Sequence, residues 1–250
     1  AHDGQLIEVF GAEELVARDY LLGGRPDVVV DVVDASNLER NLYLTTELME
    51  LGLPLVVVLN MSDVARARGV DIDTAALGRR LGAPVVAAVG SRGEGLDRMQ
   101  AAVLELASRN GDAGRPARVD FGDRLEAHLD RLVAGLARDT DGPPARARRW
   151  HAVKLLERDP RVIQDTASGE LLRRADRAAR DLDDDGPGTS DVTVSRHRYA
   201  FIDAVCREAV RGRVSPGGDV TDRVDRVVMH PLWGVPIFLG LMYVVFHLVF

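Results

Sequence analysis

The sequence predicts an α/β fold, a parallel sheet with flanking helices, followed by an all-α zone and one transmembrane helix. Short β-branched runs alternate with helical patterns over the first part of the chain, and apolar residues recur at helical spacing over the second. The last stretch, residues 231–250, contains no Asp, Glu, Lys or Arg. Alternating strands and helices are typical of a parallel sheet covered on both faces. We therefore divide the chain into residues 1–112, 113–228 and 229–250.

Three apolar runs are the expected strands of the sheet: residues 28–33, 55–59 and 85–89. Strands of this kind are buried on both faces. Helical patterns lie between and after them, over residues 38–51, 74–81 and 96–107. Ser36 or Asn37 is the expected cap of the first of these helices, with a nucleotide-linked role as the alternative.

The second zone is predicted to be a small helical bundle that follows a Gly/Pro linker at residues 111–118. Its apolar side chains recur at helical spacing in three groups: Leu125, Leu129, Leu132 and Leu136; Trp150, Val153 and Leu156; and Ile202, Val205 and Ala209. Cys206 shares the third stripe and is expected in the core. Loops are expected at residues 139–144 and 181–190.

The composition is that of a globular protein, with 46% hydrophobic and 28% charged residues. A net charge of −7 argues against a nucleic-acid partner. The single cysteine excludes an intrachain disulfide and fits a reducing compartment. The histidines are scattered and the acidic run at residues 181–185 lacks the spacing of a cation site, so no metal site is expected in this part of the protein.

The charge-free run at residues 231–250 is the expected transmembrane helix. A helix of this length rises roughly 30 Å, about the thickness of a bilayer core; the alternative is a buried core helix. Trp233 and Tyr243 suit a membrane setting. Arg223 and Arg226 precede the run and favour a cytoplasmic position for the preceding zones. Since the run reaches the last residue, we expect a larger membrane domain to continue from it.

The second apolar run ends in the tetrapeptide Asn60-Met61-Ser62-Asp63. Ligands of doubly wound folds bind at the carboxyl ends of the strands. The two oxygens of Asp63 can accept the N1–H and the exocyclic amine of guanine together, a donor pair that adenine lacks. The amide of Asn60 can bond the N7 side of the base and tie neighbouring loops together. The alternative is a strand-to-helix turn with an Asx cap.

The end of the third apolar run favours the nucleotide interpretation. Val89, Gly90 and Ser91 follow it, and a backbone N–H from this loop can reach the O6 of guanine. Gly90 lets the backbone approach closely, although simple turn chemistry also explains a glycine here.

Several segments resemble the ferrous iron transport protein B family of bacteria. The most specific is DASNLERNLYLT at residues 34–45, and N-M-x-D at residues 60–63 also resembles the form found in that family. The resemblance continues in WHAVKLLERD, HRYAFIDAV and VDRVVMHPLWGVPIFLGLMY, at residues 150–159, 197–205 and 224–243. It implies a partial P-loop-GTPase-like G domain, a helical spacer domain like a GDI domain, and the first transmembrane helix, in that order.

By this resemblance, Asn60 and Asp63 are the guanine-specificity pair, and Met61, where most GTPases carry Lys, packs against the base face. Val89, Gly90 and Ser91 form the second base-contacting loop. Val89 departs from the Ser or Thr often found there. The implied cofactor is GTP or GDP, with Mg²⁺ in the complete protein.

The resemblance implies a GTP-binding, membrane-anchored component of Fe²⁺ uptake across the bacterial inner membrane. Its partners would be guanine nucleotide, the lipid bilayer and Fe²⁺ through the membrane domain. A second copy of the chain and small accessory transport proteins are further expected partners. The zones before the membrane run would be cytoplasmic.

A phosphate-binding loop of the form G-x-x-x-x-G-K-[ST] is absent from the sequence, and no D-x-x-G switch is recognisable around residues 9–12. These motifs cradle the phosphates and hold Mg²⁺, so we expect these residues not to hydrolyse GTP. The alternative function is a degenerate G domain that acts as a nucleotide-independent, membrane-anchored scaffold. A soluble Rossmann enzyme is disfavoured, since G-x-G-x-x-G is also absent.

Overall fold

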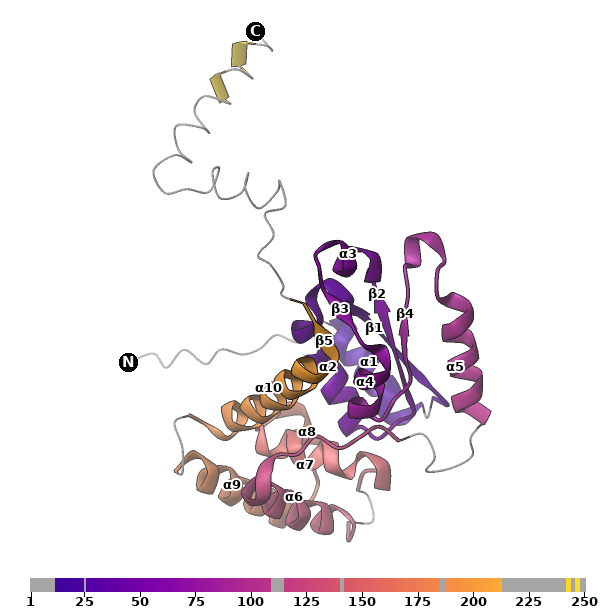
Figure 1. The fold of residues 1–250 in the computed structure, drawn as a ribbon. Coiled ribbons are helices and arrows are strands. Elements are labelled where there is room, and N and C mark those ends of the chain that lie inside the picture. Colours follow the sequence, from indigo (N-terminus) through magenta and orange to yellow (C-terminus); the bar gives the residue numbers. More distant parts are fainter. Residues whose placement is uncertain are drawn as a thin grey trace. The chain divides into compact units, whose positions relative to one another are not determined.

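The structure is a computed structural model that describes residues 12–24, 26–108, 115–139, 142–184, 188–212, 242–243 and 246–247. The described elements up to Arg211 belong to one compact unit (Figure 1). The predicted transmembrane run falls almost entirely outside these residues. Within the described part, no helix is both long and apolar enough to span a bilayer.

A parallel three-stranded sheet forms the centre of the first zone, as predicted. Its strands are β1 (Val29–Asp34), β2 (Leu55–Asn60) and β4 (Val85–Ala87), in the order β1-β2-β4. Asp34 is the register partner of Asn60, and Leu59 is the partner of Ala87. The carboxyl ends of the three strands therefore lie at one edge of the sheet, where the loops that follow can meet.

Helices cover both faces of the sheet (Figure 1). On one face lies α2 (Leu38–Glu50), whose Thr45 hydroxyl donates to the buried Asp31 carboxylate of β1 at 2.6 Å. On the other lies α5 (Leu96–Ser108), which packs on Val56 and Val58 of β2. The register partners of those two valines, Val30 and Val32 of edge strand β1, are exposed. Among the described residues, this face is covered over β2 and left open over β1.

Among the remaining elements are two short strands that the sequence did not predict, β3 (Asp71–Ile72) and β5 (Val210–Arg211). In the first zone the remaining elements are α1 (Ala12–Gly23), the 3-10 turn η1 (Ala35–Asn37), α3 (Ser62–Ala67), β3 (Asp71–Ile72), α4 (Thr74–Leu81) and the 3-10 turn η2 (Gly90–Arg92). In the second they are α6 (Gly122–Leu136), the 3-10 turn η3 (Ala145–Ala147), α7 (Arg148–Leu156), α8 (Pro160–Asp165), α9 (Gly169–Asp183), α10 (Ser190–Ala209) and β5 (Val210–Arg211).

The last long helix of the second zone returns to the first. α10 packs against α2 and α4, and the strand β5 after it pairs antiparallel with β3 through Asp71–Arg211 and Ile72–Val210. The amide of Asp73 also donates to the carbonyl of Ala209 at 2.8 Å. The helical zone is thus fastened to the sheet zone at its end.

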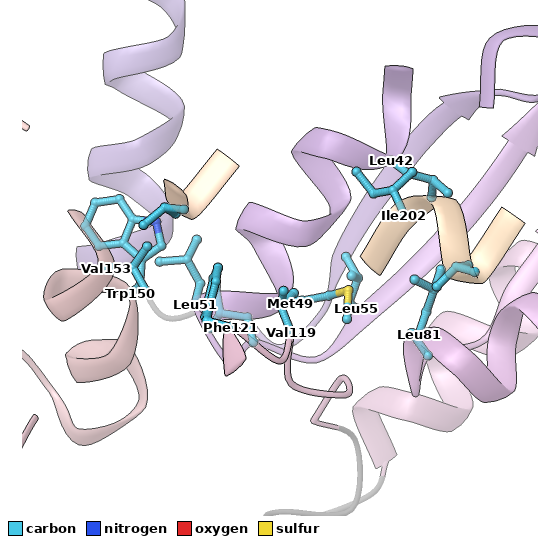
Figure 2. Packing of buried hydrophobic residues seen from close by; sticks show 14 of the residues in the cluster. Leu42, Met49, Leu51, Leu55, Leu81, Val119, Phe121, Trp150, Val153 and Ile202 are labelled. Atoms are coloured by element: carbon cyan, nitrogen blue, oxygen red, sulfur yellow. The ribbon is translucent and has the colours of Figure 1, made fainter. Parts of the chain in front are cut away.

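One continuous hydrophobic core joins the two zones. Leu42, Met49 and Leu55 of the sheet zone pack in the same cluster as Trp150 and Ile202 of the helical zone (Figure 2). The three helical stripes predicted from the sequence are all buried, which confirms them. Cys206 is also buried, and burial raises the pKa of its thiol to about 12, so it is a core residue.

A buried group of charges lies where α10 meets α2 and α7. Arg198 of α10 is fully buried and makes two hydrogen bonds to Glu50 of α2, at 2.8 and 2.9 Å. Its guanidinium also pairs with Glu157 and donates to the hydroxyl of Tyr43 at 3.2 Å. Burial raises the pKa of the Glu50 carboxyl, and the hydrogen bonds from Arg198 oppose that shift. Each buried charge thus depends on the other for compensation.

Two local expectations were wrong. The predicted loop at residues 181–190 begins later, because α9 continues to Asp183 along its apolar stripe. The cap near Leu38 is supplied by neither Ser36 nor Asn37. Instead the Asp34 carboxylate accepts from the amide and the hydroxyl of Ser36, both at 2.8 Å, and so caps η1 ahead of the helix.

Replacing Arg198 by methionine should lower the free energy of unfolding by about 3–5 kcal/mol, because Glu50 then stays buried without its partner. Urea unfolding measures this loss. The double variant with Glu50→Gln should lose less than the single one. An equal loss in both would contradict the ion-pair account.

The deficit of Arg198→Met should also depend on pH. Without Arg198 the pKa of Glu50 rises further above its ordinary value of 4.5. A carboxyl with a raised folded-state pKa contributes stability below its unfolded pKa and loses it as pH rises through the folded one. Unfolding curves should therefore show a smaller deficit near pH 5 than near pH 8, and a deficit that grows on acidification would contradict this sign.

Candidate functional site

Three loops meet at the carboxyl edge of the sheet. They are η1 after β1, residues 60–63 from the end of β2 to the first turn of α3, and residues 89–92 after β4. η1 packs against α3, and the amide of Ser62 donates to the carbonyl of Ala88 at 3.3 Å. The residues predicted to read a base are therefore brought together from two strands.

Asn60 joins the second and third loops directly. Its side-chain Oδ1 accepts a hydrogen bond from the Gly90 amide at 3.0 Å, across 30 residues of sequence. An Oδ1 used in this way leaves the Nδ2 amide as the donor, the group that the N7 of a purine requires. The sequence expectation gave the Gly90 N–H to the O6 of guanine, but in this arrangement that N–H is bonded to Asn60.

Asp63 lies in the first turn of α3, and its side chain is 28% exposed. Its Oδ1 accepts from the amide of Val64 at 2.9 Å, and its Oδ2 is 3.3 Å from the guanidinium of Arg92 on η2. The start of α3 is fixed by the hydroxyl of Ser62, which donates to the carbonyl of Leu59 at 2.6 Å. A partly exposed carboxylate in a fixed position suits the recognition of a base edge.

Met61 has a left-handed backbone, with φ of 58°, and the residue is 42% exposed. A residue with a Cβ pays roughly 1–2 kcal/mol for this conformation. Such conformations cluster in loops where geometry serves a function. An exposed thioether side chain at this tip can supply apolar contact to a flat ring.

The three predicted residues of the last loop differ in their surroundings. Val89 is buried, its amide donates to the carbonyl of Glu94 at 2.9 Å, and its carbonyl accepts from the amide of Arg92 at 3.0 Å. Val89 therefore holds the loop in shape, whereas Gly90 and Ser91 are exposed at its tip. The sequence reasoning missed Arg92, because N-x-x-D spacing carries no information about which cation the fold places beside the carboxylate.

The side chains at this edge offer the kinds of donor and acceptor that a guanine base requires. Asn60 and Asp63 offer one amide and one carboxylate on adjoining loops. The described residues contain no group of three or more His, Cys, Asp or Glu side chains that could hold a metal ion.

Comparison with known proteins assigns both zones. Residues 6–103 match the family described as Ferrous iron transport protein B, and residues 121–211 match the FeoB cytosolic helical domain. The Fe(2+) transporter FeoB of Salmonella typhimurium is 35% identical over 234 residues, which cover 94% of this chain. The chain belongs to the ferrous iron transport protein B family. The recognition made from the sequence segments is thereby confirmed.

Another relative in this family is a fusion protein from Porphyromonas gingivalis named Fe(2+) transport protein A/Fe(2+) transporter FeoB. It is 35% identical over 248 residues, or 96% of this chain. The chain spans 29% of the length of either relative.

Solved structures share the fold. A GDP-bound mutant of the S. thermophilus FeoB G-domain is 37% identical, with a TM-score of 0.73, and the match covers 81% of this chain and 76% of that one. The mGMPPNP-bound NFeoB from S. thermophilus is 36% identical, with a TM-score of 0.71 and coverage of 80% and 74%. The predicted parallel sheet with flanking helices, followed by a helical domain, is therefore that of this family.

Changing Asn60 to alanine should free the Gly90 amide and loosen the contact between the two loops, at a cost of about 1 kcal/mol. Hydrogen exchange at the Gly90 amide should become faster. Asn41→Ala is the matched control, since the side chain of Asn41 donates to the carbonyl of Asn37 in the first loop and not to the loop that carries Gly90. Unchanged exchange at Gly90 would show that the side chain does not hold the loop.

Proposed function

We propose that this chain is the base-recognising part of the G domain, with its helical spacer domain, of a GTP-binding component of ferrous iron uptake. The observation that carries the proposal is the hydrogen bond from Gly90 to Asn60, since it joins the two loops that would read the base. The G-domain relatives solved with GDP and mGMPPNP support guanine nucleotide as the ligand.

The chemistry of recognition follows from the donors and acceptors of guanine. The Asp63 carboxylate would accept from N1–H and from the exocyclic amine, and the Nδ2 of Asn60 would donate to N7. Met61 would cover one face of the ring. Gly90 and Ser91 would line the O6 side, where their exposed loop tip gives the backbone access. A base without this donor pair would leave Asp63 unsatisfied, which is a strong basis for rejection.

The transport role is inferred from the relatives and from the apolar run. The relatives are named as Fe(2+) transporters. We infer that residues 1–112 form the partial G domain and residues 113–228 the spacer, and that residues 229–250 begin a membrane anchor. This arrangement would hold the first two parts at the cytoplasmic face of the bacterial inner membrane. Fe²⁺ is then the cargo of the membrane part, with accessory transport proteins and a second copy of the chain as further partners.

A nucleotide-independent scaffold is the second candidate. It would act without phosphate and Mg²⁺ contacts, which carry most of the electrostatic stabilisation in GTPases, and no phosphate-loop motif occurs in residues 1–250. For the same reason we expect no GTP hydrolysis by these residues alone. The two candidates differ in one measurable property, which is selective binding of guanine.

Calorimetry with GDP and ADP tests the proposal. The chain should bind GDP and not ADP, and Asp63→Asn should abolish the preference for GDP. The same variant should gain binding of xanthosine diphosphate, because an asparagine can accept from N1–H and donate to the carbonyl that replaces the exocyclic amine. Asp97→Asn is the matched control, since Asp97 also lies in the first turn of a helix.

Two results would contradict base recognition through Asp63. The first is the absence of heat with GDP at millimolar concentration, which would support the scaffold. The second is an equal effect of Asp63→Asn and Asp97→Asn, which would show that the loss comes from charge at a helix start and not from a contact with the base.

A further inference from the structure

Arg92 forms an ion pair with the carboxylate of Asp63, the group that the proposed function assigns to guanine. Its guanidinium is 3.3 Å from Oδ2 of Asp63, although the two residues lie on different loops. The Watson–Crick edge of guanine is itself a cyclic guanidine, in which N1–H and the exocyclic amine are attached to the same carbon. The arginine fork and this edge therefore present the same donor pattern to a carboxylate.

The loop that carries Arg92 is held in a defined shape. The amide of Arg92 donates to the carbonyl of Val89 at 3.0 Å, and the amide of Gly93 donates to the carbonyl of Gly90 at 3.3 Å. Gly93 and Gly95 have positive φ angles of 70° and 87°. A Cβ at Gly95 would lie 2.4 Å from the carbonyl oxygen of Ala87, so this turn requires glycine. The backbone thus delivers the arginine to the edge of the site.

The carboxylate of Glu94, on the same loop, can remain paired with Arg92 when the arginine moves away from Asp63. Glu94 Oε1 lies 3.8 Å from Nη1 of Arg92, while Nη2 faces Asp63. Both carboxylates are partly exposed, and the arginine side chain is 61% exposed, so its head can move without unpacking a core. Movement toward Glu94 would clear the Asp63 edge and leave the positive charge paired.

We propose that Arg92 is an internal competitor of guanine, which pairs with Asp63 in the empty site and transfers to Glu94 when the base enters. This inference rests on the proposed function and adds a residue that sets the affinity of the site for its base. Exposed ion pairs are weak, so the competition changes affinity by a small factor of about two- to five-fold.

The test measures GMP binding by NMR titration of the wild-type chain and of two single variants. Arg92→Gln should bind GMP about two- to five-fold more tightly, because the competitor is gone. Glu94→Gln should bind GMP about two-fold more weakly, because Arg92 then has only Asp63 as a partner. Arg79→Gln, which removes an exposed charge from α4, should leave the affinity unchanged.

The signs separate competition from simple attraction of the nucleotide phosphate. A positive charge near the site would attract GMP, so its removal in Arg92→Gln would weaken binding, and removal of the negative charge in Glu94→Gln would strengthen it. Either of these signs, or no change in Arg92→Gln, overturns the proposal.

A second measurement separates this inference from the proposed function. In an Asp63→Asn background, Arg92→Gln should no longer change GMP affinity, since there is no carboxylate left to compete for. If wild type binds GMP through Asp63 and Arg92→Gln has no effect, only the competitor role fails. If neither wild type nor Arg92→Gln binds GMP, the proposed function and the competitor role fail together.

Discussion

The parallel register of three short strands is the constraint on which the site depends. β2 is buried along almost its whole length and is bonded on both sides, so its carboxyl end cannot shift without breaking two ladders. Asn60 is the last residue of that strand, and its hydrogen bond to Gly90 fixes the loop after β4 relative to β2. Asp63 lies three residues later, and the hydrogen bond from the Ser62 hydroxyl to β2 fixes the start of α3 that carries it. The side chains that face the proposed base thus need little support of their own.

The elements of this edge were predictable because burial leaves a clear mark on sequence. Mainly apolar runs located the three strands, and the end of each run located the loops. The expected burial on both faces was wrong for β1, where Val30 and Val32 are exposed. Asn60 and Asp63 were predicted to read the base because their spacing has a chemical meaning, and their role stays a prediction. Arg92 could not be found in this way, since its contact with Asp63 joins loops that are nearly 30 residues apart and depends on the glycine turn at Gly95. The predicted transmembrane helix lies almost wholly outside the described residues and stays a prediction.

Contacts between the zones explain why the helical zone is more than a spacer in sequence. Arg198 on α10 donates a hydrogen bond to Glu50 at the end of α2. The helix α2 begins directly after η1, and η1 packs against α3. A packed route therefore leads from the helical zone to the loop that carries Asp63. Local sequence signals could predict each helix of this route but not the route itself, because a buried arginine resembles any other arginine in a helix until its partner is known. Contiguity of this kind is a condition for coupling, and the coupling free energy between the two ends is what would establish it.

The division between base recognition and phosphate binding determines what kind of affinity these residues can have. Phosphate contacts and Mg²⁺ add binding energy to any nucleoside diphosphate, whereas the proposed contact of Asp63 would distinguish one base from another. A chain with the second part and without the first should bind weakly in absolute terms while keeping a large ratio between guanine and adenine nucleotides. Competition from Arg92 lowers that absolute affinity further, because it acts on the empty carboxylate. The ratio of affinities for two bases, and not the affinity for one, is therefore the quantity that reports whether this site is a nucleotide site.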